Sequence, residues 1–417
     1  LINNNREYQK SIADWQTAQQ NVRSASSAAY PSVNLDWGIT RLGNIQSFEF
    51  DQDENDSEPP IELEVASENM FKGSFSVQQQ IFSGSVFGAI RVAQSYQKAA
   101  DNQLKVEKNQ LIRDYLSAYA LAAMLSDLRH VNEQMVEYTN SHFNEAKLLY
   151  EIGATDKYLL LRAEVEYLNS IPALKEAERS YHASVSNLKL MLNLDKNTDL
   201  TVKGFDVELD MSGNNQGLLD RAEKNRPEIE GAKNVAEAYK RAIVVFRSAR
   251  LPSVTGFGNY DRQNQWDLFS QRDTWNNSWT AGINVHIPLF SGFATTAKIQ
   301  KGMLNYQKAS VDESILIDAI RIEVDLAYDD YVRSNTDFDA WFRNVELASE
   351  GFEIANLRWD NGVGSELELR DARIALQEAR ANLSRAKYDK LRTKINMLFA
   401  LGEIGNVIII ETQNNGQ

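Results

Sequence analysis

Ile81-Phe82-Ser83-Gly84 and Leu289-Phe290-Ser291-Gly292 are two versions of one short motif, 208 residues apart. A second motif precedes each of them: Tyr30-Pro31-Ser32-Val33 lies before the first and Leu251-Pro252-Ser253-Val254 before the second. The offset of this outer pair is 221, because the first copy carries 13 more residues between its two motifs. The chain therefore repeats an ordered set of motifs.

A third pair follows the Phe-Ser-Gly motifs. Glu151-Ile152-Gly153-Ala154 returns as Asp360-Asn361-Gly362-Val363 after 209 residues. A repeat of this length is too long for a solenoid unit, whose period is roughly 20–50 residues. We therefore interpret the chain as a duplicated half-protein. The first structural repeat covers residues 1–226 and the second covers residues 227–417.

The composition excludes several classes of function. The 417 residues carry a net charge of -14, which disfavours a nucleic-acid partner. There is no cysteine, and the four histidines (His130, His142, His182 and His286) show no metal-ligand spacing. No phosphate-binding glycine loop or nucleophile elbow is present. We expect no enzyme activity, no cofactor and no metal site.

Alternation of apolar and polar residues predicts two strands in each repeat. Val33, Leu35, Trp37 and Ile39, for example, alternate with polar or small residues. The four strands are expected at about residues 32–41, 71–82, 254–263 and 275–288. The acidic stretch Asp51-Gln52-Asp53-Glu54-Asn55-Asp56, which lies between the first two strands, is predicted to be a solvated loop.

Long segments without glycine or proline predict helices. Residues 89–152 form such a run, about 96 Å long if helical throughout. Apolar or small residues recur every seventh position within it, which favours helices lying side by side. We expect one helical hairpin over about residues 85–192 and another over about residues 294–401. Shorter mixed segments are expected at about residues 193–226 and 402–410.

Four amphipathic strands are too few to close a barrel, and an open sheet edge is prohibitive in lipid. If the strands span a membrane, several chains must share one barrel. Trp275 and Trp279 fall on the same strand face as Ile283 and Val285, which suits a lipid-facing stripe with aromatic residues near the membrane interface. The alternative is a soluble sandwich edge with buried tryptophans.

In the order and spacing of these features the chain resembles the TolC family of outer-membrane efflux and secretion channels, over nearly its whole length. The features are the doubled helix–proline–strand entry, the two Phe-Ser-Gly strand exits and the glycine hairpin tips. Arg226-Pro227-Glu228, which opens the second repeat, and the Asp371-Ala372 step beyond Gly362 belong to the same pattern.

The resemblance implies an α+β membrane protein with an internal two-fold repeat. Three chains with four strands each would form a 12-stranded outer-membrane β-barrel, continued by a long periplasmic α-helical coiled-coil barrel, with the mixed segments as a belt. The homotrimer would sit in outer-membrane lipid of a Gram-negative bacterium. It would be the passive, gated exit duct of a tripartite efflux or type I secretion system. A periplasmic adaptor protein would open it, and an inner-membrane pump of the RND, ABC or MFS type would energise it. Drug, metal and protein export are not separated by the sequence.

The resemblance also implies two sets of functional residues. The periplasmic aperture, carried over by position, would be Leu367, Glu368 and Asp371. The adaptor-docking hairpin tips would be Ile152, Gly153, Ala154, Thr155, Asn361, Gly362, Val363 and Gly364.

The chain departs from the family at the tips. Some members latch this end with an Arg two residues after the second tip glycine and a Tyr three residues before it, where this chain has Gly364 and Trp359. Arg358 or Arg370 is a candidate to replace the latch. Two other interpretations remain open at this point: a soluble or peripheral coiled-coil scaffold, and a periplasmic adaptor. An adaptor should carry one hairpin, whereas this chain predicts two.

Overall fold

The computed structural model describes residues 2, 4–43, 47–50, 61–64, 68–212, 215–266 and 275–411. The acidic stretch 51–56 and the tail from residue 412 lie outside the described residues. The chain divides into two compact units. The first comprises Leu1–Trp15, Ala99–Lys233 and Val311–Gln417, and the second comprises Gln16–Lys98 and Asn234–Ser310. Each unit combines segments from both halves of the chain.

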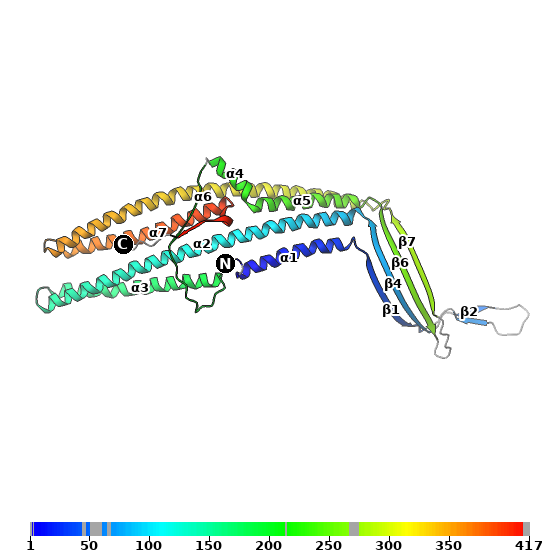
Figure 1. Ribbon diagram of the computed structural model, residues 1–417, viewed down its shortest axis with the longest axis horizontal. Coiled ribbons are helices and arrows are strands. Elements are labelled where there is room, and N and C mark those ends of the chain that lie inside the picture. The colour runs from blue at the N-terminus through cyan, green and yellow to red at the C-terminus, as the bar shows by residue number, and fades with distance from the viewer. Residues whose placement is uncertain are drawn as a thin grey trace, which may run out of the picture. The chain divides into compact units, whose positions relative to one another are not determined.

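The second unit contains a four-stranded antiparallel sheet (Figure 1). Its strands, in spatial order, are β1 (Ser32–Arg41), β4 (Asn69–Phe82), β6 (Ser253–Trp266) and β7 (Asn276–His286). The sequence pattern places its four strands at nearly the same residues, although it ends the second repeat's first strand at 263 and begins its second at 275. Neighbouring strands pair antiparallel throughout.

The register gives this sheet one apolar and one polar face. Residues that pair across the four strands form rows, and successive rows point to opposite faces. One row consists of Leu35, Phe75, Tyr260 and Trp279, and the next consists of Asp36, Ser74, Asp261 and Ser278. The two edge strands are exposed along almost their whole length. Among the described residues nothing covers the apolar face, since Leu35 and Trp37 are each 73% exposed.

Two long helical hairpins account for most of the chain. The first joins α2 (Gly84–Glu151) to α3 (Lys157–Met191), and the second joins α6 (Ala294–Asp360) to α7 (Glu366–Ala400) (Figure 1). Their arms are 68 and 35 residues long in the first hairpin and 67 and 35 in the second. In the described part of the chain, no helix holds an apolar stretch that is long enough to cross a membrane.

Shorter elements surround the hairpins. The helices are α1 (Arg6–Ser27), α4 (Asn215–Asn225), α5 (Pro227–Ser248) and the 3₁₀ turn η1 (Ile404–Asn406). Two further strand pairs are β2 (Ser47–Phe50) with β3 (Ile61–Glu64), and β5 (Phe205–Val207) with β8 (Ile409–Glu411). The sequence pattern predicts none of these four short strands. The pair of β5 and β8 joins the two mixed segments that the sequence places at about 193–226 and 402–410.

The main core lies in the first unit, around the C-terminal part of α7. One cluster packs Met397 and Leu401 against Leu218 and Ile229, and another packs Ile395 and Phe399 against Leu116. Arg226 anchors this core from the Arg-Pro-Glu motif. Its guanidinium donates to the carbonyl of Phe399 at 3.1 Å and to the carboxylates of Glu228 and Glu323 at 3.1 and 2.9 Å. The carbonyls at a helix C-terminus lack partners within the helix, so the Arg226 guanidinium supplies a hydrogen-bond donor to the last turn of α7.

Candidate functional site

Both hairpin tips end their first arm in the same way. At the first tip, the amide of Gly153 donates to the carbonyl of Tyr150 and that of Ala154 donates to Leu149. At the second tip, the amides of Gly362 and Val363 donate to the carbonyls of Trp359 and Arg358. This is the Schellman arrangement, which needs a left-handed residue at the turn. Gly153 and Gly362 supply it with φ of 72° and 69°.

The second arm of each hairpin starts with a capping side chain. Asp156 is the N-cap of α3, and its side chain accepts from the amide of Leu159. Ser365 caps α7 in a capping box, in which the side chain of Glu368 accepts from the amide of Ser365. Capping residues satisfy amides that the helix itself leaves free. Each tip is therefore a short turn whose backbone is hydrogen-bonded on both sides.

The tips expose apolar side chains. Ile152 and Val363 are both 68% exposed. Ile152 precedes Gly153 at the first tip, whereas Val363 follows Gly362 at the second. Ala154 and Asn361 are also exposed, whereas Thr155 and Gly364 are partly buried.

The expected aperture residues lie on the first two turns of α7. Leu367 is 50% exposed, and the side chains of Glu368 and Asp371 are 53% and 61% exposed. Each carboxylate has a cationic neighbour on its own hairpin. Arg358 approaches Glu368 at 3.7 Å, and Arg370 lies 3.1 Å from Asp371.

Charged contacts between the hairpins come from residues that the sequence did not point to. The guanidinium of Arg373, on α7, donates to the carboxylate of Glu166, on α3, at 2.8 Å. Arg162 of α3 lies 3.8 Å from Glu366 of α7. We call these four residues the cross-hairpin pairs. Arg358 and Arg370, which the sequence offers as replacements for the family latch, contact their own hairpin in the ion pairs above.

The cross-hairpin pairs are well shielded from solvent. The side chains of Arg373 and Glu366 are 9% and 12% exposed, and those of Glu166 and Arg162 are 20% and 23% exposed. The guanidinium of Arg373 also lies over the ring of Tyr138 at 4.3 Å. A buried ion pair is costly to break on one side, because the remaining charge is left in a poorly solvated place. Sequence reasoning has no means to find such a pair, since Glu166 and Arg373 are 207 residues apart.

The expected interface tryptophans lie at the β7 edge of the sheet. Trp275 immediately precedes β7 and packs edge-on against Phe71 at 5.4 Å, with Arg262 over its ring at 4.4 Å. Trp279 is 75% exposed on the apolar face. Over the ranges that the structure describes, no group of three or more His, Asp or Glu side chains could hold a metal ion.

A solved structure of an outer-membrane channel shares this fold. The Campylobacter jejuni CmeC outer membrane channel matches with a TM-score of 0.77 and 17% sequence identity, covering 99% of this chain and 85% of that chain. The fold of helical hairpins with a four-stranded sheet is therefore that of the outer-membrane channels.

Sequence comparisons then give the family. The model of the outer membrane efflux protein family matches residues 1–194 and 218–403, and the chain belongs to this family. The outer membrane protein TolC of Vibrio cholerae serotype O1 is 21% identical over 395 residues, covering 94% of this chain and 86% of that protein. The alkaline protease secretion protein AprF of Pseudomonas aeruginosa is 21% identical over 340 residues, covering 80% and 69%.

The resemblance to the TolC family is confirmed. The protein is an efflux protein of the outer membrane of a Gram-negative bacterium, and it extends into the periplasm.

Proposed function

We propose that three copies of the chain form a passive, gated exit duct, opened by a periplasmic adaptor and energised by an inner-membrane pump. The observation that carries this proposal is the two-faced sheet whose two edge strands are both exposed, on a chain that also holds two long hairpins. The TolC and AprF relatives support export from the cell as the task. The duct performs no chemistry of its own.

The sheet supports a shared barrel. In lipid, every backbone polar group needs a partner, so the open edges at β1 and β7 must be paired. Bacterial barrels of this kind have at least 8 strands. Three copies of a four-stranded sheet supply 12, with β1 of one copy beside β7 of the next. The apolar face would then contact outer-membrane lipid and the polar face would line water.

The helices α6 and α3 each carry a stripe of exposed apolar side chains. On α6, exposed apolar residues recur on one side of the helix, at Val311, Ile315, Ile322, Leu326, Leu347 and Ile354. On α3, Tyr158, Leu161, Val165 and Leu168 are exposed near the tip. Stripes of this size mark contact surfaces. Because they lie on different hairpins, contact between α6 of one copy and α3 of the next gives a ring in which every copy uses both stripes.

In such a ring, Leu367, Glu368 and Asp371 would narrow the periplasmic end. Each carboxylate would occur three times around the axis, and carboxylate rings favour cations. The nearby Arg358 and Arg370 offset part of this negative charge. We therefore expect moderate cation selectivity.

The cross-hairpin pairs would hold the aperture closed. They lie within two turns of the aperture residues on α7 and connect that helix to α3 of the other hairpin. Moving α7 away from α3 separates buried charges, so the closed arrangement is favoured until a ligand supplies the free energy. The adaptor would supply it by binding the tips, where Ile152 and Val363 are exposed apolar contacts.

Single-channel conductance in a planar bilayer tests the proposal. The detergent-purified protein should give small, long-lived, cation-selective steps, blocked by multivalent cations from the periplasmic side. Glu368→Gln/Asp371→Asn should lower both the selectivity and the block. Asp199→Asn/Glu208→Gln removes the same charge at exposed positions in the mixed segment and should change neither. A protein that gives no conductance and stays soluble without detergent would overturn the duct and favour a coiled-coil scaffold.

A further inference from the structure

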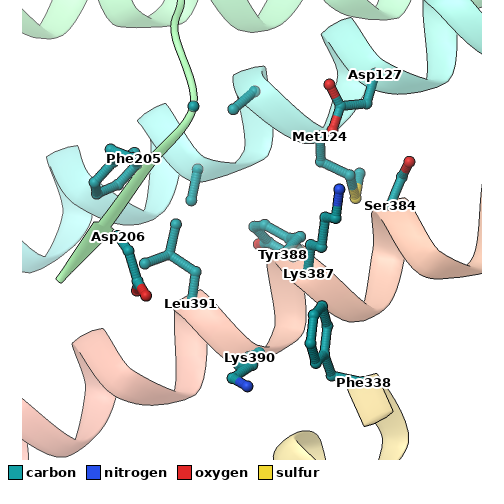
Figure 2. A pocket seen from close by; sticks show the side chains of 13 residues that line it. Met124, Asp127, Phe205, Asp206, Phe338, Ser384, Lys387, Tyr388, Lys390 and Leu391 are labelled. Carbon is teal, nitrogen blue, oxygen red and sulfur yellow. The ribbon is translucent and has the colours of Figure 1, made fainter. Parts of the chain in front are cut away.

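A pocket of about 420 Å³ lies in the first unit, where α2, α6 and α7 approach the segment of β5 (Figure 2). This volume falls within the range of small-molecule sites, roughly 300–1,000 Å³. Its walls are mixed, and the apolar part includes Met124 from α2, Phe205 from β5, Phe338 from α6 and Leu391 from α7. It lies away from the hairpin tips and from the aperture residues, so the proposed duct function does not account for it.

Two opposite charges line this pocket without being joined. Asp127 comes from α2 and Lys387 from α7, and Figure 2 shows Lys387 extending from α7 toward Met124 and Asp127. The two charges attract each other. Neither side chain, however, makes a hydrogen bond or an ion pair within 4.0 Å to any other residue that the structure describes.

The other charged groups of the pocket are already engaged. Asp206 accepts two hydrogen bonds from Lys394, at 2.7 and 2.8 Å. The ammonium of Lys390 lies 4.3 Å from the centre of the Phe338 ring. Asp127 and Lys387 are thus the pair that remains available to a ligand.

Partial burial makes this availability costly for Asp127, whereas Lys387 is exposed to solvent. Desolvation raises the pKa of the Asp127 carboxyl, and the charges of Lys387 and His130 only partly oppose it. A poorly solvated carboxylate gains from a direct, charge-assisted hydrogen bond. A ligand that carries both charges can pair with both side chains, whereas a ligand with a single charge can pair with only one of them.

We propose that this pocket binds a small zwitterion, an amino acid or short peptide that carries both a free ammonium and a free carboxylate. Its ammonium donates to the Asp127 carboxylate, and its carboxylate accepts from the Lys387 ammonium. An apolar side chain packs against Met124, Phe205 and Leu391. Because the pocket is lined by both hairpins and by β5, the bound ligand stabilises the folded arrangement of these elements.

Calorimetric titration of the detergent-solubilised full chain with three probes of similar shape tests this site. The probes are L-phenylalanine, which carries both charges, 3-phenylpropanoate, which carries only the carboxylate, and 2-phenylethylammonium, which carries only the cation. Saturable binding is expected for L-phenylalanine, with at least tenfold weaker binding of the other two. L-Phenylalanine should also raise the unfolding temperature.

Variants of Asp127 and Lys387 then test whether each charge contributes to binding. Asp127→Asn, which preserves shape, and Lys387→Met should each weaken L-phenylalanine binding at least tenfold. Asp199→Asn and Lys196→Met make the same charge changes at exposed positions of the first unit and should leave binding unchanged. The dipeptide Ala-Phe, titrated in the same way, tests the short-peptide case. Equal affinity for the first three probes, retention of binding in Asp127→Asn/Lys387→Met, or no saturable binding of either L-phenylalanine or Ala-Phe would each overturn the proposal.

Discussion

At the scale of single residues, loss of the ion pair between Arg373 and Glu166 should lower the free energy of unfolding strongly. Glu166→Gln removes the negative charge and leaves the guanidinium of Arg373, 9% exposed, without its counter-ion. Breaking one side of a buried pair costs roughly 3–5 kcal/mol. We expect a matching loss in the free energy of unfolding, measured by urea denaturation of the solubilised protein.

The double variant Arg373→Met/Glu166→Leu is the matched comparison. It removes both charges and keeps apolar bulk, so it should recover most of the lost stability. If the single variant is as stable as the wild type, the pair is not buried in solution and cannot serve as a closing contact.

Removing the charge of Asp127 should stabilise the folded chain, whereas removing that of Glu166 should destabilise it, and the effect at Asp127 should depend on pH. Burial raises the pKa of its carboxyl in the folded chain above the ordinary value of 3.8. The folded state therefore holds the proton more tightly, and stability is lost as pH rises from about 4 through the folded pKa. Asp127→Asn removes this loss. The variant should have a higher unfolding temperature than the wild type near pH 7, and the difference should vanish near pH 3. A constant difference across this range would contradict the assignment.

These residues also mark the limit of sequence reasoning about the site. Leu367, Glu368 and Asp371 follow from their position after a recognisable turn, and the structure places them on the first two turns of α7. Their role in the aperture remains a prediction. Arg373 is two residues beyond Asp371 but was not found, because its partner lies on the other hairpin and no local pattern encodes that contact. The sequence does not point to Asp127 or Lys387 either, because only the folded chain brings these residues of different hairpins into one pocket.

At the scale of elements, the second tip should tolerate a methyl group less well than the first. A Cβ at Gly364 would lie 2.9 Å from the backbone nitrogen of Trp359 and 3.0 Å from the backbone carbon of Arg358. A Cβ at Gly153 would meet no atom within 4 Å, although its φ of 72° makes alanine strained by about 1–2 kcal/mol. Gly364→Ala should therefore displace the turn, whereas Gly153→Ala should only weaken it.

Hydrogen exchange of the backbone amides measures how far each substitution disturbs its turn. In Gly364→Ala, the amides of residues 363 and 364, which both donate to the carbonyl of Arg358 at 2.9 Å, should exchange much faster. In Gly153→Ala, the amide of Ala154 should keep most of its protection. Equal acceleration at both tips would mean that the close approach at Gly364 is relieved without moving the backbone.

The long helices and the main strands are the elements that the sequence predicts well. The run 89–152 within α2 is free of glycine and proline, and the alternation in residues 32–41 matches β1 throughout. The helices α3 and α6 are continuous although α3 contains Pro172 and α6 contains Gly302 and Gly351. The pairs formed by β2 with β3 and by β5 with β8 are only three or four residues per strand, too short for a periodic pattern. The sequence does not predict the two compact units either. Helices such as α2 and α6 run through both of them, so the boundary falls within continuous helices.

At the scale of the whole molecule, the shared barrel makes a prediction about β1 and β7. Within one chain these strands lie at opposite edges of the sheet, with β4 and β6 between them. Three strand spacings separate them by about 14 Å, whereas a disulfide requires Cα atoms within roughly 4.4–6.8 Å. A bond between β1 and β7 can therefore form only between two copies. The chain contains no cysteine, so no native residue can form a disulfide that competes with an introduced pair.

Asn34→Cys in β1, combined in turn with Ser278→Cys, Thr280→Cys, Gly282→Cys or Asn284→Cys in β7, scans the register on the polar face. At least one combination should yield covalent dimers and trimers on a non-reducing gel, because a closed ring pairs each edge with the next copy. Ser76→Cys/Asn259→Cys is the control, since these residues are directly paired within one chain and should give a bridged monomer. If every β1–β7 combination stays monomeric while the control is oxidised, neighbouring copies do not pair through these edges. The 12-stranded barrel would then be wrong, and the exposed apolar face would need another partner.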